Sequence, residues 1–432
     1  MTYKETIDYL YSALPMFSRI GDAAIKKDLT NTSILCERLG NPQQTFKAVH
    51  IAGTNGKGSV SHMMAAVLQT AGYKTGLYTS PHLKDFRERI KVNGEMVSED
   101  FVVRFTEKAK PLIQEIAPSF FEITVAMAFQ YFAEMQVDIA VIETGLGGRL
   151  DSTNIILPEV SIITNIGMDH MHLLGNTLSE IAFEKAGIIK QDIPVVIGET
   201  NEDTAAVFNK SAAAHNAPLV FADQQRYTDD YTYRNHQLQV EVVTKDGNEK
   251  TSYSLDLTGL YQAKNLVTLL SGIDELVKKG WHILHEDTHA ALSAVKKLTG
   301  LHGRWEQLHY KPDVFVDVAH NEDGIKQLAA QIEWMNFREL HIVIGMVKDK
   351  DIEKVLPLLP KEAHYYFTRA QIPRALPEEQ LAAMAKLHHL NGHHYPDVNT
   401  AVKTAMQKAQ ADDLVVICGS VFVVGEVDLK NL

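Results

Sequence analysis

Short apolar runs alternate with longer segments of helical periodicity along most of the chain. In the first half the runs are FKAVHIA, KTGLYTS, VDIAVIETG, VSIITNIG and IPVVIGE, and stretches such as 121–136 and 177–190 are helical in pattern. Runs that are apolar on both faces are typical of strands in a parallel sheet covered by helices. We therefore predict a doubly wound, mostly parallel α/β domain.

A different pattern occupies residues 238–257, where apolar and polar residues alternate around Asp246-Gly247. An Asp-Gly pair between alternating segments is a strong signal for a β-hairpin. We interpret this segment as a small β insertion. Residues 261–298 then read as helical.

The α/β alternation restarts after Thr299-Gly300-Leu301-His302-Gly303, which has two glycines in five residues. The later apolar runs are DVFVDVAHN, LHIVIGMV, AHYYFTRA and DLVVICGSV. We expect a first domain over 1–298, a hinge over 299–303, and a second, smaller Rossmann-like α/β domain over 304–432.

Composition narrows the classes of function. The 432 residues are 45% hydrophobic and 22% charged, as in a globular protein of more than one core. The formal net charge of -12 argues against a general nucleic-acid surface. We expect no membrane span and no signal peptide, since Lys4, Glu5 and Asp8 interrupt the first residues, and we predict a cytoplasmic protein. Cys36 and Cys418 are too few for a disulfide framework or a zinc cluster.

The segment Gly53-Thr54-Asn55-Gly56-Lys57-Gly58-Ser59 stands between a predicted strand and a predicted helix. Backbone N–H groups and the positive helix end in such a turn can hold phosphate oxygens, and Lys57 would reach the β and γ phosphates. The glycine spacing is shorter than in the usual P-loop pattern. The alternative is a tight turn with an exposed lysine.

Three further candidates, Ser80, Glu143 and His170, lie at or just after the ends of predicted strands. Open α/β sheets bind ligands at that edge, so these side chains can converge. A hydroxyl, a carboxylate and an imidazole do not make a calcium cage, whereas Mg²⁺ takes few protein ligands beside phosphate and water. The alternatives are a turn serine, a surface glutamate and a hydrogen-bonded structural histidine.

Lys185 lies on a helix that Thr177 and Glu180 begin as a capping box. Apolar neighbours on that helix, including Ala182 and Ala186, would lower the pKa of the lysine and make its amine nucleophilic. The alternative is a structural lysine paired with Glu184.

The phosphate loop resembles that of the folylpolyglutamate synthase and dihydrofolate synthase family, within the Mur ligase superfamily. Further segments similar to this family follow in order from about residue 45 to Ser420: YTSPH at 78–82, FRERI at 86–90, ETGLGGRLDSTN at 143–154, DH at 169–170, EKAGI at 184–188, HGR at 302–304 and DVAHN at 317–321. An ordered series of this length is very unlikely to arise by chance.

The resemblance implies roles for individual residues. It assigns Ser80, Glu143 and His170 to magnesium, and it implies a carbamylated lysine at Lys185. It implies an adenine contact for Asn265. His320 and Ser420, at strand ends of the second domain, are candidates for contacts to the incoming glutamate, and we count His320 among the catalytic residues. From the residues themselves, the fork of Arg304 could stabilise a transferring phosphate or form an interdomain salt bridge, and Asp317 could take ribose or orient the nucleotide.

For a pterin-bearing substrate, the family points to Phe121-Glu122-Ile123-Thr124 and to Leu150-Asp151-Ser152. An aromatic face beside a carboxylate suits a flat, hydrogen-bonding ring. The alternative for Phe121 is a core residue at the start of a helix.

These features predict an ATP- and Mg²⁺-dependent ligase that adds L-glutamate to a folate, and also to dihydropteroate, through an acyl phosphate. We expect a monomer.

One rival function is that of a cell-wall Mur ligase. Gly58 and the early position of the loop at Gly53 argue against this function. Another is a nucleotide-binding regulatory module without turnover, which the combination of Lys57, Glu143, His170 and Arg304 disfavours.

Overall fold

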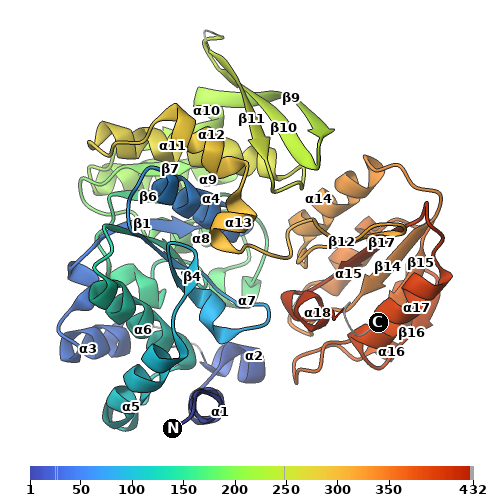
Figure 1. Cartoon of the computed structure of the whole chain (residues 1–432), viewed down its shortest axis with the longest axis horizontal. Helices are drawn as coiled ribbons and strands as arrows, with labels where there is room; N and C mark the ends of the chain where they lie inside the picture. The colour runs from blue at the N-terminus through green and yellow to red at the C-terminus, as the bar shows by residue number, and fades with distance from the viewer. Residues whose placement is uncertain (25, 27, 248, 429–432) are drawn as a thin grey trace. The chain divides into compact units, whose positions relative to one another are not determined.

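The computed structural model describes residues 1–24, 26, 28–247 and 249–428 (Figure 1). It divides into two compact units, each described by itself below. The first unit comprises Met1–Gly167, Met171–Asp256 and Gln262–Leu301, and the second comprises Met168–His170, Leu257–Tyr261 and His302–Leu432. Two short segments from the middle of the chain therefore pack with the C-terminal residues. The hinge role of residues 299–303 stays a prediction.

An eight-stranded sheet organises the first unit, in the order β4-β3-β2-β5-β1-β6-β7-β8. The strands from β2 to β8 across this order are parallel, and β3 and β4 are antiparallel additions at one edge. The prediction of a mostly parallel, doubly wound sheet is confirmed. The strands are β1 (Lys47–Ala52), β2 (Thr75–Tyr78), β3 (Ile90–Val92), β4 (Glu95–Met96), β5 (Ile139–Glu143), β6 (Val160–Ile163), β7 (Val195–Ile197) and β8 (Leu219–Phe221).

Helix α4 (Lys57–Thr70) follows the phosphate loop and is buried from Ser59 to Leu68. It packs against β2 and β5 on one side and against α11, α12 and α13 on the other. A helix covered on both sides must be apolar all round, which explains the run VSHMMAAVL. The covering helices are α11 (Gln262–Lys278), α12 (His285–Leu292) and α13 (Val295–Thr299). The single helical stretch expected over 261–298 is thus three helices, and Gly280, at φ 93°, lies in the first break.

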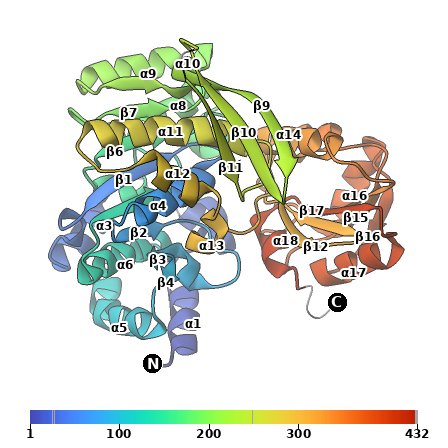
Figure 2. The same cartoon turned by 45° about the horizontal axis from the view of Figure 1, so that its top comes forward.

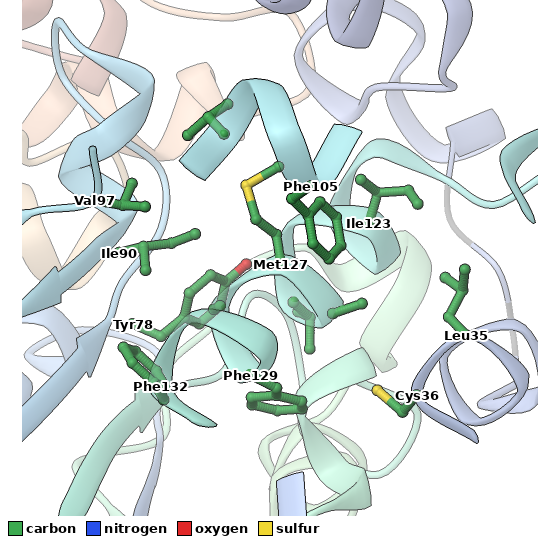
Figure 3. Close-up of a cluster of buried hydrophobic side chains, with 14 of the residues drawn as sticks. Leu35, Cys36, Tyr78, Ile90, Val97, Phe105, Ile123, Met127, Phe129 and Phe132 are labelled. Carbon is green, nitrogen blue, oxygen red and sulfur yellow. The ribbon is translucent and has the colours of Figure 1, made fainter. Parts of the chain in front are cut away.

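One apolar cluster of the first unit lies around α6 (Phe120–Met135), whose ring side chains Phe129 and Phe132 are fully buried (Figure 3). It includes residues of β2, β3 and three helices for which the sequence pattern gave no specific expectation: α1 (Tyr3–Ala13), α3 (Thr30–Arg38) and α5 (Glu99–Ile116). Cys36 is buried in this cluster, and Cys418 is buried in the second unit, as expected of small apolar residues.

The remaining helices of the first unit are short or lie at its surface. Helix α8 (Leu178–Ala186) ends at Ala186 rather than near Lys190. Its C-cap residue, Gly187, lies so close to Arg149 that a Cβ there would be 2.3 Å from the arginine backbone. The others are α2 (Phe17–Ile20), α7 (Met171–Leu174), α9 (Glu202–Ala214), α10 (Ala222–Gln225), and the 3-10 turns η1 (Gly21–Ala24), η2 (Pro42–Gln44), η3 (Phe86–Arg89) and η4 (Ser152–Ile155).

The predicted hairpin is confirmed: β10 (Gln237–Thr244) pairs antiparallel with β11 (Lys250–Leu255). A third strand, β9 (Arg226–Arg234), joins them, so the insertion is a three-stranded antiparallel sheet (Figure 2). Its sequence RYTDDYTYR is mostly exposed and carries too few apolar residues to predict a strand.

A six-stranded sheet organises the second unit, in the order β12-β13-β17-β14-β15-β16. All neighbours are parallel except β12 and β13, which confirms the second α/β domain. The strands are β12 (Glu306–His309), β13 (Asp313–Val316), β14 (Leu340–Ile344), β15 (His364–Phe367), β16 (Gly392–His394) and β17 (Leu414–Cys418). The helices are α14 (Glu322–Glu333), α15 (Ile352–Val355), α16 (Glu378–Leu387), α17 (Val398–Lys408), α18 (Val421–Glu426) and the turn η5 (Leu356–Leu358).

Candidate active site

The loop at 53–56 joins β1 to α4, as the motif requires, and it lies in close contact with its neighbours. A Cβ on Gly53 would be 1.9 Å from Thr164 Oγ1, and one on Gly56 would be 2.3 Å from Asn265 Oδ1. Gly56 also has φ 81°, a conformation that favours glycine. Steric contacts therefore require glycine at both positions, and the loop is a tightly packed turn rather than a loose surface loop.

The end of β6 holds the backbone of the loop in place. Thr54 N donates to Asn165 O at 3.0 Å, and Asn55 N donates to Asn165 Oδ1 at 2.9 Å. The Thr54 hydroxyl donates to Gly167 O and accepts from Gly167 N, at 3.1 and 2.9 Å. Sequence reasoning missed Asn165. Its signal was available, because the run VSIITNIG turns polar at the carboxyl edge of the strand.

Two lysine ammonium groups converge on one carbonyl at the start of the loop. Lys57 Nζ donates to Gly53 O at 3.0 Å and to Thr54 O at 3.1 Å. Lys185 Nζ, from α8, donates to the same Gly53 oxygen at 2.8 Å, and Lys185 is only 3% exposed. Glu184, the alternative partner for Lys185, accepts from Arg149 at 2.8 Å. A glycine-rich turn at a helix N-terminus with the ammonium group of Lys57 beside it makes a site for an anion.

Ser80 and Glu143, two of the predicted magnesium ligands, are brought together. They follow or end the adjacent parallel strands β2 and β5, and Ser80 N donates to Glu143 Oε2 at 3.1 Å. Glu143 is 4% exposed. A hydroxyl and a carboxylate are hard oxygen donors of the kind that Mg²⁺ prefers, so this pair fits the ion.

The third predicted ligand, His170, belongs to the second unit with Asp169. Its Nε2 lies 3.3 Å from Lys350 Nζ, and burial, followed by the charge of Lys350, lowers the pKa of His170 to about 3. Asp169 accepts from Lys350 at 2.6 Å and from Asn321 at 3.0 Å, and His320 Nε2 is 3.4 Å away. Although burial opposes ionisation, the hydrogen bond from His320 and the charge of Lys350 hold the pKa of Asp169 well below its usual range. Asn321 belongs to the motif at 317–321, whereas Lys350 had no signal in the sequence pattern.

Asn265, the predicted adenine contact, lies against the phosphate loop. Its side-chain amide donates to Gln262 Oε1 at 2.8 Å, and Gln262 donates in turn to Ser59 Oγ at 3.1 Å. All three side chains are buried. This short chain joins the first turn of α11 to the first turn of α4.

The run 121–124 is mostly core. Phe121 is half-buried, and Gly145 lies so close to its ring that a Cβ there would be 2.4 Å away. Glu122 forms a capping box with Ser119 at the start of α6, while Ile123 and Thr124 are fully buried. Among these four residues, Phe121 is the one with surface available to a ligand. Direct substrate contact by the other three stays a prediction that their burial disfavours.

Asp151 is 5% exposed and accepts four hydrogen bonds. Oδ2 accepts from the backbone N–H groups of Gly145 and Leu146 at 2.8 and 2.9 Å. Oδ1 accepts from the backbone N–H and the hydroxyl of Thr153, at 3.0 and 2.5 Å. Burial raises the pKa of Asp151. A carboxylate with these donors organises the loop 145–153 that surrounds it. Of its sequence neighbours, Leu150 is half-buried and Ser152 is 8% exposed.

Asp317, which follows β13, is engaged in a similar way. It accepts from Tyr261 Oη at 2.7 Å, from Trp305 N at 2.9 Å and from Ala319 N at 2.8 Å. Burial raises its pKa. Of the two roles suggested by the sequence, these contacts favour orientation of neighbouring groups over a hydrogen bond to ribose.

The other predicted residues of the second unit lie at loop positions. Arg304 is half-buried, and its Nη1 donates to Gly303 O at 3.3 Å. His320 Nδ1 donates to Val318 O at 2.8 Å. Ser420 caps α18, accepting from Val423 N at 3.1 Å, and is 4% exposed. His320 and Ser420 follow β13 and β17, which are adjacent parallel strands.

Among the described residues, no helix combines the length and the apolar composition that crossing a membrane would take.

Comparisons with known proteins identify the family of both domains. Residues 51–270 match the Mur ligase middle domain, and residues 303–421 match the Mur ligase glutamate ligase domain. The dihydrofolate synthase/folylpolyglutamate synthase of Bacillus subtilis is 34% identical over 416 residues, which cover 93% of this chain and 94% of that protein.

Solved structures are similar over nearly the whole chain. The Mycobacterium tuberculosis folylpolyglutamate synthase, complexed with ADP and AMPPCP, has a TM-score of 0.84 at 31% identity and covers 92% of this chain and 94% of its own. Escherichia coli FolC, in complex with DHPP and ADP, has a TM-score of 0.84 at 28% identity and covers 98% of this chain and 96% of its own. With its two matched domains and its phosphate loop, the chain belongs to the folylpolyglutamate synthase/dihydrofolate synthase family of ATP-dependent Mur-type ligases.

Proposed function

We propose that this chain uses ATP to join L-glutamate to a folate, and also to dihydropteroate, through an acyl phosphate. The observation that carries the proposal is the loop between β1 and α4, in which sterics require Gly53 and Gly56 and Lys57 Nζ lies 3.0 Å from Gly53 O at the N-terminus of α4. Relatives named for both synthase activities support the choice of substrates.

The chemistry needs an activated carboxylate, because a carboxylate does not react with an amine at neutral pH. The acceptor carboxylate attacks the γ phosphorus of ATP, ADP leaves, and the α-amino group of glutamate then displaces phosphate from the acyl carbon. Lys57 would leave the loop carbonyls for the β and γ phosphates and stabilise the charge that develops there. The backbone N–H groups of the loop would hold the remaining phosphate oxygens.

For the metal, we propose that Ser80 and Glu143 hold Mg²⁺, with His170 as a further ligand. The ion would neutralise phosphate charge during transfer. Glu143 would contribute its carboxylate charge to the ion, and the N–H of Ser80, which donates to Glu143 Oε2 at 3.1 Å, helps to orient that carboxylate.

For Lys185, we propose carbamylation in the active enzyme. The neutral amine would add to carbon dioxide and release one proton, which converts a cation into an anion that a metal ion can approach. The burial of Lys185 at 3% exposure supports this, since desolvation favours the neutral amine.

For the second unit, we propose that His320 and Ser420 contact the incoming glutamate and that Arg304 contacts phosphate. His320 and Ser420 follow adjacent parallel strands, the edge at which open α/β sheets bind ligands. We propose that Asp317 orients the backbone on which Arg304 is carried, since it accepts from Trp305 N. We further propose a cytoplasmic monomer.

The test is an assay of the purified protein with ATP, Mg²⁺, labelled glutamate and either dihydropteroate or a reduced folate. Labelled product with both acceptors is the expected result. Product with a UDP-sugar peptide acceptor instead would establish the rival cell-wall ligase, and glutamate-independent binding of ATP without ADP release would establish the regulatory module.

A further inference from the structure

His50 is a fully buried histidine that the mechanism above does not use. It lies in β1, three residues before Gly53, with strand neighbours Ile142 on β5 and Ser161 on β6. Its Nε2 is 2.9 Å from Thr153 Oγ1. Burial, followed by the nearby charge of Lys190, lowers the pKa of His50 to about 3, so the ring is neutral at physiological pH.

The direction of the hydrogen bonds follows from the proton count. The hydroxyl of Thr153 has one proton, and it donates that proton to Asp151 Oδ1 at 2.5 Å, because an ionised carboxylate can only accept. The Thr153 oxygen must therefore accept from His50, which places the imidazole proton on Nε2. His50 Nδ1 is then unprotonated, and it has no hydrogen-bond partner among the described residues.

The same chain continues into the loop that borders Phe121. Asp151 Oδ2 accepts from the N–H groups of Gly145 and Leu146. Gly145 in turn lies against the Phe121 ring, so closely that a Cβ on Gly145 would be only 2.4 Å from it. A continuous path of hydrogen bonds thus runs from the central strand β1, through Thr153 and Asp151, to the loop at 145–146, and this loop packs against Phe121.

We propose that His50 is a positioning residue for the acceptor, acting through Thr153 to hold Asp151 and the loop at 145–146 in place. The inference rests on the proposed function, because it takes Phe121 and this loop as the acceptor surface. Without the imidazole donor, the Thr153 hydroxyl loses one of its two partners and can turn away from Asp151. The loop against Phe121 then relaxes, and the acceptor binds less tightly.

Three variants isolate this role. His50→Leu removes the donor, His50→Gln keeps a side-chain N–H that can reach the hydroxyl, and Ser161→Ala is the matched control. Ser161 is the register neighbour of His50 on β6, is equally buried, and donates to Ile188 O at 2.8 Å. Steady-state kinetics would give KM for the acceptor, KM for ATP and kcat for each variant, beside thermal unfolding.

We expect His50→Leu to raise KM for the acceptor about fivefold, the usual worth of one hydrogen bond, with KM for ATP unchanged. His50→Gln should raise KM for the acceptor by at most half as much as His50→Leu does on a logarithmic scale. Ser161→Ala should leave both KM values unchanged. An unchanged acceptor KM in His50→Leu overturns the inference. An equal rise in both KM values, or the same effect in Ser161→Ala, also overturns it, because either result indicates a general loss of structure.

A second pair of variants tests the route through Thr153 and covers the case in which His50→Leu does not fold. Thr153→Val removes the hydroxyl, and Thr153→Ser keeps it. We expect an increased acceptor KM in Thr153→Val alone, and no further increase when His50→Gln is added to it. Equal acceptor KM values in Thr153→Val and Thr153→Ser would overturn the inference.

Failure of the inference is distinguishable from failure of the proposed function. Phe121→Ala tests the acceptor surface directly. If His50→Leu has no effect while Phe121→Ala raises the acceptor KM, the surface is correct and the role of His50 is wrong. If Phe121→Ala also leaves the acceptor KM unchanged, the acceptor surface itself is misplaced.

Discussion

Lys57→Ala tests the phosphate site with a calculable effect. An ammonium group about 4 Å from a phosphate charge, at the effective dielectric constant of about 20 that suits partly buried pairs, contributes roughly 4 kcal/mol. If that interaction is made in the transition state, its loss lowers kcat about 1,000-fold. The cost to the fold is smaller, because Lys57 is half-buried and water can take its place at the loop carbonyls of Gly53 and Thr54, to which it donates. We expect a loss of about 1 kcal/mol in the free energy of unfolding.

The assay measures glutamate-dependent ADP release beside thermal unfolding. Lys279→Ala is the matched control, since Lys279 also donates to a backbone carbonyl, Glu159 O at 3.1 Å, in the same unit. The control should keep full turnover. Turnover within tenfold of the unaltered protein in Lys57→Ala would refute the phosphate-site assignment, and unfolding of the variant would show that the lysine is structural.

Other predictions concern the metal, the buried lysine and the histidines. Glu143→Gln should raise the Mg²⁺ concentration needed for half-maximal activity, because the carboxylate charge is lost while its shape is kept; an unchanged magnesium titration would remove Glu143 from the metal site. Lys185→Ala should be nearly inactive and should recover partly with added small carboxylates, and a mass increase of 44 Da on Lys185 under native conditions would report the carbamate directly. Full activity of Lys185→Ala without additives would contradict that role. Stability should fall as the pH drops below about 6.5, because burial lowers the pKa of both His50 and His82 to about 3, so the unfolded chain binds protons that the folded chain does not. Denaturant unfolding at pH 7 and pH 5 should differ by about 2 kcal/mol for each of these histidines, and His50→Gln should remove its own share.

The parallel strands were predictable because each is a short apolar run that ends at glycine or a polar residue. Strand β5, with the sequence IAVIE, ends at Glu143, and both the burial of the strand and the position of Glu143 at the edge of the sheet follow from that pattern. Strand β9 was not predictable, since RYTDDYTYR is exposed and is held by pairing with β10 rather than by burial. A strand that is held by pairing with its neighbour, and not by burial, leaves little trace in hydrophobic periodicity.

Within the site, the spacing of glycines located the phosphate loop, but the contacts that fix it come from distant residues. Asn165 holds the backbone of the loop from another strand, and Gly56 needs its missing Cβ because Asn265 lies behind it. Burial also separates residues that a motif groups together. Phe121 retains exposed surface, whereas Glu122 caps a helix in the core. Such differences depend on three-dimensional packing and could not be derived from spacing alone.

The central claim is that the acceptor carboxylate is phosphorylated before the amide bond forms. Acceptor labelled with ¹⁸O in the reacting carboxylate, turned over with ATP, Mg²⁺ and glutamate, tests it directly. An acyl-phosphate route transfers one carboxylate oxygen to phosphate, so we predict one ¹⁸O atom in each inorganic phosphate released, with one ADP and one amide product formed. Release of unlabelled phosphate together with amide product would contradict the account.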